Sequence, residues 1–312
     1  MALPSLPELR QRLRSLSGFV PATLLPPASQ GRDDQATISP ARLIEPGPVT
    51  ARAVGAPAVW PGPVAFLDGT QSVDVICYVG TSRLVHADVA AAVRERVGRE
   101  ARTVVEERLR LVVARPEVLA AAGPMLDGFT TVAIEDDEPV HPLRDLDAAL
   151  SLVDHAREDL ERKLGDSYRR WSPHWLIVDG SLADSVGWAR VPRMIGVSKS
   201  HARLPFEGDD LITYLQLPAG HRSSVFQPSS HRQARVYAWG LRLWPWAERD
   251  LLYGLVRVEA APGDATLAMV DQISRWLLAE RSPISAPDPR WDRLLYGIRG
   301  VEEYLKAARG AR

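Results

Sequence analysis

Two short apolar runs, each followed by Asp-Gly and a hydroxyl residue, place the strongest constraint on how this chain folds. Residues 64–67 (VAFL) lead into Asp68 and residues 175–178 (WLIV) lead into Asp179. Short runs rich in β-branched and aromatic residues, bounded by turn residues, predict buried strands. In open sheets with helices on their faces, ligands gather just outside strand ends. We therefore expect both aspartates to end strands and to face a site.

The other apolar patterns predict a mixed α/β fold. A run at 194–197 predicts a further strand that ends near Lys199, and apolar residues at helical spacing predict a long helix over 142–170. The remaining patterns predict helices at 5–17, 116–123, 264–279 and 291–309. They predict a hairpin in which strands 64–67 and 73–79 are joined by a turn at 68–70. Further strands are predicted at 84–87, 103–114, 130–134, 211–217, 235–246 and 251–260. Residues 18–62 are rich in Pro and Gly and predict irregular chain.

Composition narrows the class of protein without naming a function. The 312 residues carry a formal net charge of −1, so no global field favours nucleic acid, although a local basic groove is compatible with this total. The single cysteine, Cys77, lies in an apolar run, which predicts a buried thiol and a reducing cytoplasm. No signal peptide and no membrane-spanning run is expected.

The two aspartates suggest a metal site. Carboxylates that converge repel each other unless a divalent cation neutralises them, and hard oxygen ligands suit Mg²⁺ or Mn²⁺. Glu161 and Glu158 share one face of the helix before Asp179, so either is a candidate third ligand, and Lys199 is a candidate phosphate contact. The alternative remains open that Asp-Gly is ordinary turn chemistry and that these side chains are simply solvated.

These motifs resemble the NurA family of DNA-end-processing nucleases from about residue 60 onward. The resemblance rests on the segments 66–70 (FLDGT), 176–182 (LIVDGSL), 195–199 (IGVSK), 236–237 (VY) and 254–259 (GLVRVE). It implies an RNase H-like fold related to the PIWI domain, with helices flanking a mixed sheet. It also implies a Mn²⁺-dependent carboxylate cluster that acts by two-metal phosphodiester hydrolysis, a ring-shaped homodimer, and work on DNA with the hexameric ATPase HerA.

The resemblance assigns roles to particular residues. Asp68, Glu161 and Asp179 match the metal-binding carboxylates. Tyr296 matches the tyrosine of a late Tyr-Pro motif, but Gly297 replaces the proline and no histidine follows. The last metal ligand is therefore open, with Glu302 or Glu303 as candidates.

Two further sets of residues are candidates for contact with DNA. Arg222, Arg232 and Arg235 give residues 218–235 a positive character, although a solvated loop explains it equally well. Three tryptophans, Trp239, Trp244 and Trp246, are compatible with base stacking or with a core or dimer interface.

The sequence thus predicts an extension over 1–62 and a nuclease domain over 63–312. The expected activity is Mn²⁺- or Mg²⁺-dependent cleavage of DNA ends, in repair and end resection or in defence against foreign DNA. The alternative is a catalytically weakened subunit with the same fold that binds nucleic acid or docks on the translocase.

Overall fold

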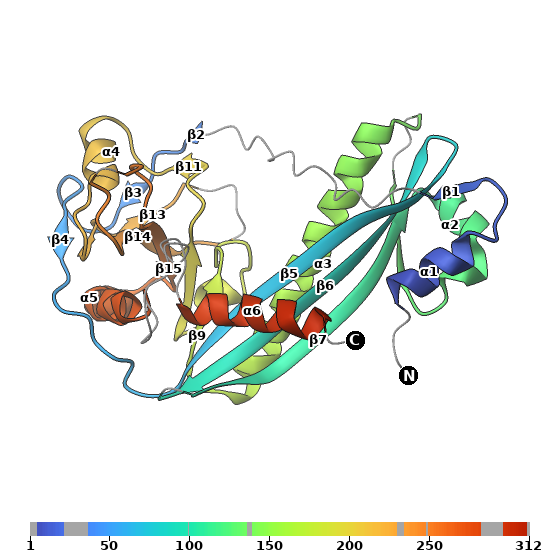
Figure 1. The fold of residues 1–312 in the computed structure, drawn as a ribbon. Coiled ribbons are helices and arrows are strands. Elements are labelled where there is room, and N and C mark those ends of the chain that lie inside the picture. Colours follow the sequence, from blue (N-terminus) through green and yellow to red (C-terminus); the bar gives the residue numbers. More distant parts are fainter. Residues whose placement is uncertain are drawn as a thin grey trace.

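The computed structural model describes residues 5–21, 37–98, 100–135, 139–229, 234–247, 249–281 and 296–310. Within these residues one mixed sheet dominates, with the strand order β3-β13-β14-β15-β10-β9-β5-β6-β7-β8. β1 pairs with β5, and β12 joins β14 to β4. Figure 1 shows that β5, β6 and β7 extend as a long ribbon away from the shorter strands.

The strands of this sheet are β1 (Phe19–Pro21), β3 (Arg42–Leu43), β4 (Arg52–Ala53), β5 (Val64–Val79), β6 (Ser82–Val97), β7 (Glu100–Ala114), β8 (Thr130–Ala133), β9 (Trp175–Asp179), β10 (Met194–Ser198), β12 (His221–Arg222), β13 (Phe226–Gln227), β14 (Tyr237–Arg242) and β15 (Leu255–Ala260). A separate parallel pair consists of β2 (Thr37–Ile38) and β11 (Arg203–Leu204). The helices are α1 (Leu6–Leu13), α2 (Pro116–Ala122), α3 (Pro142–Trp171), α4 (Gly208–Leu215), α5 (Asp264–Ala279) and α6 (Tyr296–Gly310), with short 3₁₀ turns η1 (Gly123–Leu126) and η2 (Trp188–Arg190).

The predicted hairpin around Asp68 is wrong. β5 runs without a turn from Val64 to Val79, and residues 68–70 pair with Ala92, Ala91 and Ala90 of β6. The reversal comes later, between Val79 and Ser82, where Gly80 has a φ of 58°. Asp-Gly favours turns locally, but β6 offers pairing partners along the whole strand, and long-range pairing overrides the local preference.

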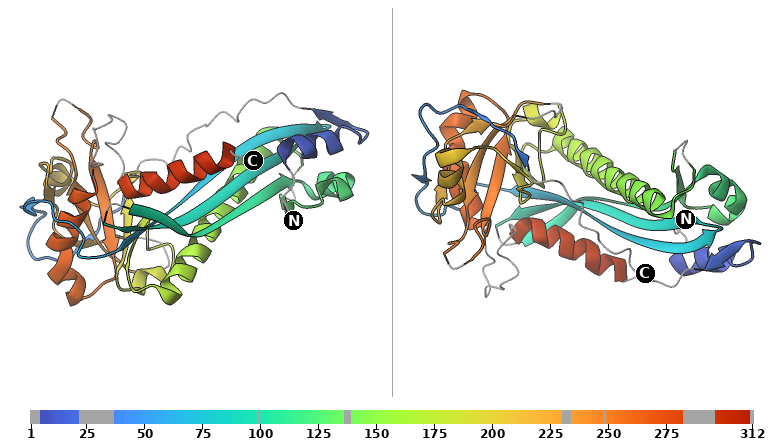
Figure 2. Two further views of the ribbon diagram at one scale, coloured as in Figure 1. Left: turned by 60° about the horizontal axis from the view of Figure 1, so that its bottom comes forward. Right: turned by 90° about the horizontal axis from the view of Figure 1, so that it is seen from above.

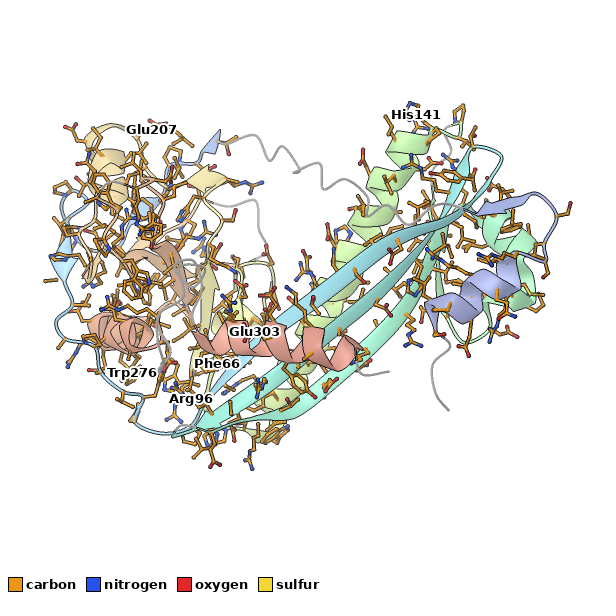
Figure 3. All side chains as sticks on the ribbon, in the orientation of Figure 1. Phe66, Arg96, His141, Glu207, Trp276 and Glu303 are labelled. Atoms are coloured by element: carbon orange, nitrogen blue, oxygen red, sulfur yellow. The ribbon has the colours of Figure 1, made fainter. Side chains whose placement is uncertain are left out.

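Helices cover the two faces of this sheet, as the right panel of Figure 2 shows for α3 and α6. Leu67 of β5 packs with Leu160 and Leu164 of α3, whereas Phe66 packs with Ile298 of α6. This alternation along β5 follows from the two-residue period of a strand. Phe66, labelled in Figure 3, lies beneath α6, where a Cβ at Gly297 would come within 2.3 Å of its ring. Glycine at 297 therefore lets α6 pack closely on the sheet.

The long helix, the strands that become β9 and β10, and the antiparallel pair β14–β15 were correctly predicted. The strand predicted at 211–217 is wrong, because residues 208–215 form α4. Its apolar residues at 211, 214 and 215 fit a helix face, and buried Tyr214 packs on Phe206 and Phe226. Trp239 is fully buried and its Nε1 donates to Ser274 Oγ at 2.9 Å, so this tryptophan belongs to the core.

Among the described helices, none combines the length and the apolar character needed to cross a bilayer.

Candidate active site

Asp68 and Asp179 lie side by side where β9 ends. β5 and β9 pair in parallel with Leu67 opposite Val178, so the next residue on each strand is an aspartate. Because register neighbours in parallel strands point to the same face, both carboxylates project on one side of the sheet. β9 stops at Asp179 while β5 continues, which leaves Asp68 beside an open strand end. Asp68 is 9% exposed.

Glu161 reaches these aspartates from α3, on the opposite face of the sheet. A Cβ at Gly69 would lie 2.2 Å from Glu161 Oε1, so only glycine at this position leaves room for the carboxylate. The side chain of Glu161 is 12% exposed, whereas that of Glu158 is 52% exposed. Of the two candidates on this helix, Glu161 is therefore the residue that the structure brings to Asp68.

The three carboxylates interact electrostatically. Burial, the Asp179 charge and the Glu161 charge together raise the pKa of Asp68 well above its usual value, despite a 2.8 Å hydrogen bond from the Gly69 backbone N–H. Burial is also the main cause that raises the pKa of Glu161 to about 7; Asp179 and Glu158 add to it and Arg157 opposes it. Such shifts mark a place where negative charge is concentrated beyond what the surroundings neutralise.

Two basic side chains partly neutralise this charge. Lys199 Nζ donates to Asp179 Oδ2 at 2.9 Å, and Arg157 forms an ion pair with Glu161 within α3. The Lys199 side chain is 36% exposed, so it can exchange partners with solvent or a ligand. Lys199 thus lies at the site that the sequence suggested, held by the aspartate of the neighbouring strand.

A buried glutamate fixes the turn that follows Asp179. Glu259 of β15 is 1% exposed, and its Oε2 accepts from Ser181 Oγ at 2.7 Å and from the Leu182 backbone N–H at 2.9 Å. Its Oε1 accepts from Arg257 Nε at 3.0 Å. At Gly196 of β10, a Cβ would lie 2.7 Å from the Gly180 carbonyl oxygen, so the turn also packs directly on the next strand.

The donor set of this site suits a hard divalent cation. Carboxylate oxygens are the ligands that Mg²⁺ and Mn²⁺ prefer, and a cation would relieve the repulsion that raises the pKa of Asp68. In the conformation described, no three His, Cys, Asp or Glu side chains of the described residues are arranged to share one ion. Glu161 and Asp179 are instead paired with Arg157 and Lys199, so binding requires these two carboxylates to exchange partners.

Glu302 and Glu303, the candidates for the last metal ligand, pair with basic residues of their own helix. Glu302 forms an ion pair with Lys306 along α6 at 2.5 Å, and Glu303 pairs with Arg299 at 2.7 Å. In the described part of the chain, neither glutamate contacts Asp68. The Tyr296 side chain lies outside the described residues, although its backbone begins α6.

The three arginines proposed for DNA differ in their placement. Arg222 is 3% exposed and pairs with Glu45 and with Asp271 of α5, so its guanidinium is not available to a phosphate without breaking both pairs. Arg235 is exposed and follows Ala234, whose N–H donates to the Ala183 carbonyl beside the Asp179 turn. Arg232 lies outside the described residues.

Sequence reasoning missed two residues of this site, Arg157 and Glu259. Arg157 lies four residues before Glu161 on α3, and this i, i+4 spacing does indicate an ion pair. Glu259 is an acidic residue inside the apolar strand 255–260, where a charge requires a buried partner. That signal was present in the sequence, but the identity of the partner depends on the fold.

The fold and the site define a mixed α/β protein of the RNase H-like type. More specifically, the structure is similar to the crystal structure of the NurA nuclease from Sulfolobus solfataricus, with a TM-score of 0.50 over 82% of this chain and 81% of that chain, at 10% identity. The fold is therefore that of NurA, in agreement with the resemblance inferred from the motifs. No family model matches the chain, and no curated protein matches it in sequence.

Two human endonuclease V structures also align. The catalytic domain aligns over 80% of this chain and 85% of its own, at 15% identity and with a TM-score of 0.34. A second structure aligns over 80% of this chain and 86% of its own, also at 15% identity, with a TM-score of 0.30. The fold assignment rests on the NurA likeness.

Proposed function

We propose that this protein is a divalent-metal-dependent nuclease that hydrolyses phosphodiester bonds at DNA ends. The observation that carries the proposal is the placement of Asp68 beside Asp179 at the end of β9, with Glu161 approaching through the space left by Gly69. Buried carboxylates that repel each other are stabilised when a divalent cation binds between them. The NurA-type fold supports phosphodiesters as the substrate class.

Asp68, Glu161 and Asp179 are the residues that would hold Mn²⁺ or Mg²⁺. When bound, such ions activate a water molecule for attack on phosphorus and stabilise the leaving oxygen. Asp68 and Glu161 would have to be ionised to act as ligands, against the burial that raises the pKa of each. Lys199, once free of Asp179, would contact the phosphate as a point charge, and Arg157 would have to release Glu161 for that carboxylate to bind the ion.

The assembly is part of the proposal. We propose that the chain works as a homodimer in the cytoplasm and processes ends, in repair or resection, together with a HerA-type hexameric ATPase. Support comes from the fold shared with NurA and from the sequence motifs described above. Arg235, which is exposed beside the Asp179 turn, is the arginine best placed to contact the DNA backbone.

The test is cleavage of end-labelled linear DNA in Mn²⁺, Mg²⁺ or EDTA by the wild-type protein and by Asp179→Ala. Both proteins are assayed alone and with a HerA-type ATPase, and closed circular DNA serves as the substrate without ends. We expect metal-dependent cleavage of linear DNA that EDTA and the substitution both abolish. A control variant, Asp159→Ala, changes an exposed carboxylate of α3 and should cleave normally.

Equal cleavage by wild type and Asp179→Ala would place the chemistry elsewhere. Binding of DNA without cleavage under every condition would favour the second reading, a catalytically weakened subunit. The second reading is supported by the pairing of Glu302 and Glu303 with Lys306 and Arg299 of α6, which leaves the last metal ligand unassigned.

A further inference from the structure

A small polar cavity lies next to the carboxylate site, on the far side of the Asp179 turn. Its volume is about 270 Å³. Gly180 and Ser181, which follow Asp179 directly, form part of its wall, and so do Ser198 and Ser200, which flank Lys199. A molecule in this cavity is therefore adjacent to the two residues that we assign to metal and phosphate.

The cavity combines cationic and hydroxyl donors. Arg257 and Arg203 line it together with five serines, Ser39, Ser181, Ser198, Ser200 and Ser229, and with two acidic residues, Asp184 and Glu259. Arg257 is 14% exposed and, among the described contacts, uses only Nε, toward Glu259; its two terminal nitrogens remain as donors. Arg203 is exposed and pairs with no described carboxylate. Guanidinium groups bind phosphate through paired hydrogen bonds, which single hydroxyl groups do not provide.

An apolar surface completes the lining. Phe226, Leu204 and Pro205 border the same cavity and offer a place for a flat ring, while the serines offer partners for its polar edge. At about 270 Å³ the space falls just below the range of roughly 300–1,000 Å³ typical of drug-sized ligands. It is therefore of a size for one nucleotide and not for a longer oligonucleotide.

A larger cavity of about 670 Å³ lies at the opposite ends of β9 and β10, where Trp175, Met194 and Trp276 line it. Because β9 and β10 are parallel, that cavity opens at their starts, whereas the carboxylates stand at their ends. Of these two cavities, the smaller is the one at the strand ends that carry the carboxylates.

We propose that the smaller cavity binds the single nucleotide next to the phosphodiester that is cleaved, with Arg257 and Arg203 on its phosphate and its base against Phe226. The proposal rests on the proposed nuclease function, because it names the part of the substrate held beside the reacting bond. Occupancy of this cavity sets which phosphodiester stands at the carboxylates, so cleavage releases one nucleotide at a time.

The test uses Ser200→Tyr, which fills the cavity from an exposed position, and Arg203→Gln, which removes an exposed cation from it. Ser17→Tyr changes an exposed serine at the far end of the molecule and is the matched control. Binding of radiolabelled dAMP in EDTA is measured by equilibrium dialysis, with deoxyadenosine as a probe that lacks phosphate. Products of linear DNA cleavage in Mn²⁺ are resolved on sequencing gels.

We expect Ser200→Tyr to weaken dAMP binding at least tenfold and to raise the KM for DNA, with mononucleotides replaced by longer products. Arg203→Gln should weaken binding of dAMP but not of deoxyadenosine, and Ser17→Tyr should behave as wild type. Wild-type cleavage with an unchanged KM and product pattern in Ser200→Tyr overturns the cavity assignment and leaves the nuclease intact. Binding of dAMP by a wild-type protein that cleaves nothing overturns the nuclease and leaves a nucleotide site. No binding of dAMP by the wild type overturns the cavity assignment directly.

Discussion

Asp68 and Asp179 occupy neighbouring positions on the parallel strands β5 and β9, one residue beyond the pair Leu67–Val178. Burial, together with the charges of Asp179 and Glu161, raises the pKa of Asp68 well above its ordinary value. A protein that keeps two such carboxylates together sacrifices stability for what they bind. Removing one of these carboxylates should therefore stabilise the fold and weaken what the site binds.

Replacing Asp68 by Asn removes one charge of the repelling set while keeping the shape of the side chain. In EDTA at pH 7 the free energy of unfolding should rise by about 1–2 kcal/mol, a gain typical of relieving a strained functional site. Cleavage in Mn²⁺ should fall at least ~100-fold, because a ligand oxygen is lost. Urea unfolding and a cleavage assay check both effects on the same preparation. A variant that is less stable than wild type, or that cleaves normally, contradicts this account of Asp68.

Gly69→Ala tests how Glu161 reaches the site. The added Cβ would lie 2.2 Å from Glu161 Oε1, so the carboxylate must move. Because Gly69 does not have a positive φ and the obstructing atom ends a flexible side chain, we expect the fold to persist. Cleavage should fall by about 10- to 100-fold, since small misplacements of a reacting group have effects of this size.

The matched control is Gly62→Ala, where a Cβ meets no atom within 4 Å. Steady-state cleavage rates and thermal unfolding of both variants provide the comparison. Equal activity of Gly69→Ala and Gly62→Ala would show that the position of Glu161 does not matter to the reaction.

Glu259→Gln tests the buried support of the Asp179 turn. The substitution removes the carboxylate that Arg257 pairs with and places an amide N–H₂ where Ser181 and Leu182 now donate. Breaking a buried ion pair from one side typically costs about 3–5 kcal/mol, and we expect a loss of stability near the lower end of this range. We also expect kcat to fall about tenfold, because the turn that carries Asp179 loses its fixed position.

The control for this position is Glu303→Gln, which alters a surface pair on α6. Denaturant unfolding gives the stability and single-turnover cleavage gives the rate of the chemical step. Loss of stability without any change in that rate would make Glu259 a packing residue only.

The pair Arg115–Asp145 predicts a dependence of stability on pH. Hydrogen bonds from Arg115, at 2.8 and 2.9 Å, hold the pKa of buried Asp145 below its usual value of 3.8. For a carboxyl group with a lowered pKa in the folded state, the stabilisation is present above the ordinary pKa and is lost as the pH falls through the folded value. Asp145→Asn should thus be less stable than wild type by about 3–5 kcal/mol at pH 7, with the gap narrowing below about pH 4.

Urea unfolding at pH 7, 5, 4 and 3 measures this gap. Asp159→Asn, which changes an exposed i, i+3 partner of Arg162 on the same helix, should differ from wild type by less than about 0.5 kcal/mol throughout. A gap for Asp145→Asn that stays constant down to pH 3 would contradict the role given to Arg115.

The sequence predicted those elements whose patterns are local. The helical period over 142–170 and the apolar run before Asp179 correspond to α3 and β9 within a residue or two. The segment 211–217 was predicted as a strand, but residues 208–215 form α4, in which buried Tyr214 packs among aromatic residues. The continuous course of β5 through Asp68 depends on pairing with β6, which no local pattern reports.

The site, too, was predictable from the sequence only where the pattern is local. Asp68 and Asp179 stood out because each follows an apolar run, but their adjacency is a matter of register between strands far apart in sequence. Glu161 was a candidate by its helix position, and the space at Gly69 is what distinguishes it from Glu158. Arg222 was a candidate DNA contact because residues 218–235 carry several basic side chains, yet Glu45 and Asp271 pair with it in the interior.

The most direct test of the account is the binding of Mn²⁺ to the carboxylate site, measured by electron paramagnetic resonance of free Mn²⁺ in titrations at pH 7.5. Wild type, Asp68→Asn and Asp179→Asn are compared with Asp159→Asn as the control. The account predicts that wild type and Asp159→Asn bind Mn²⁺ alike, and that each site variant loses at least ~10-fold in affinity. Equal Mn²⁺ binding by all four proteins would contradict a metal centre built on Asp68 and Asp179.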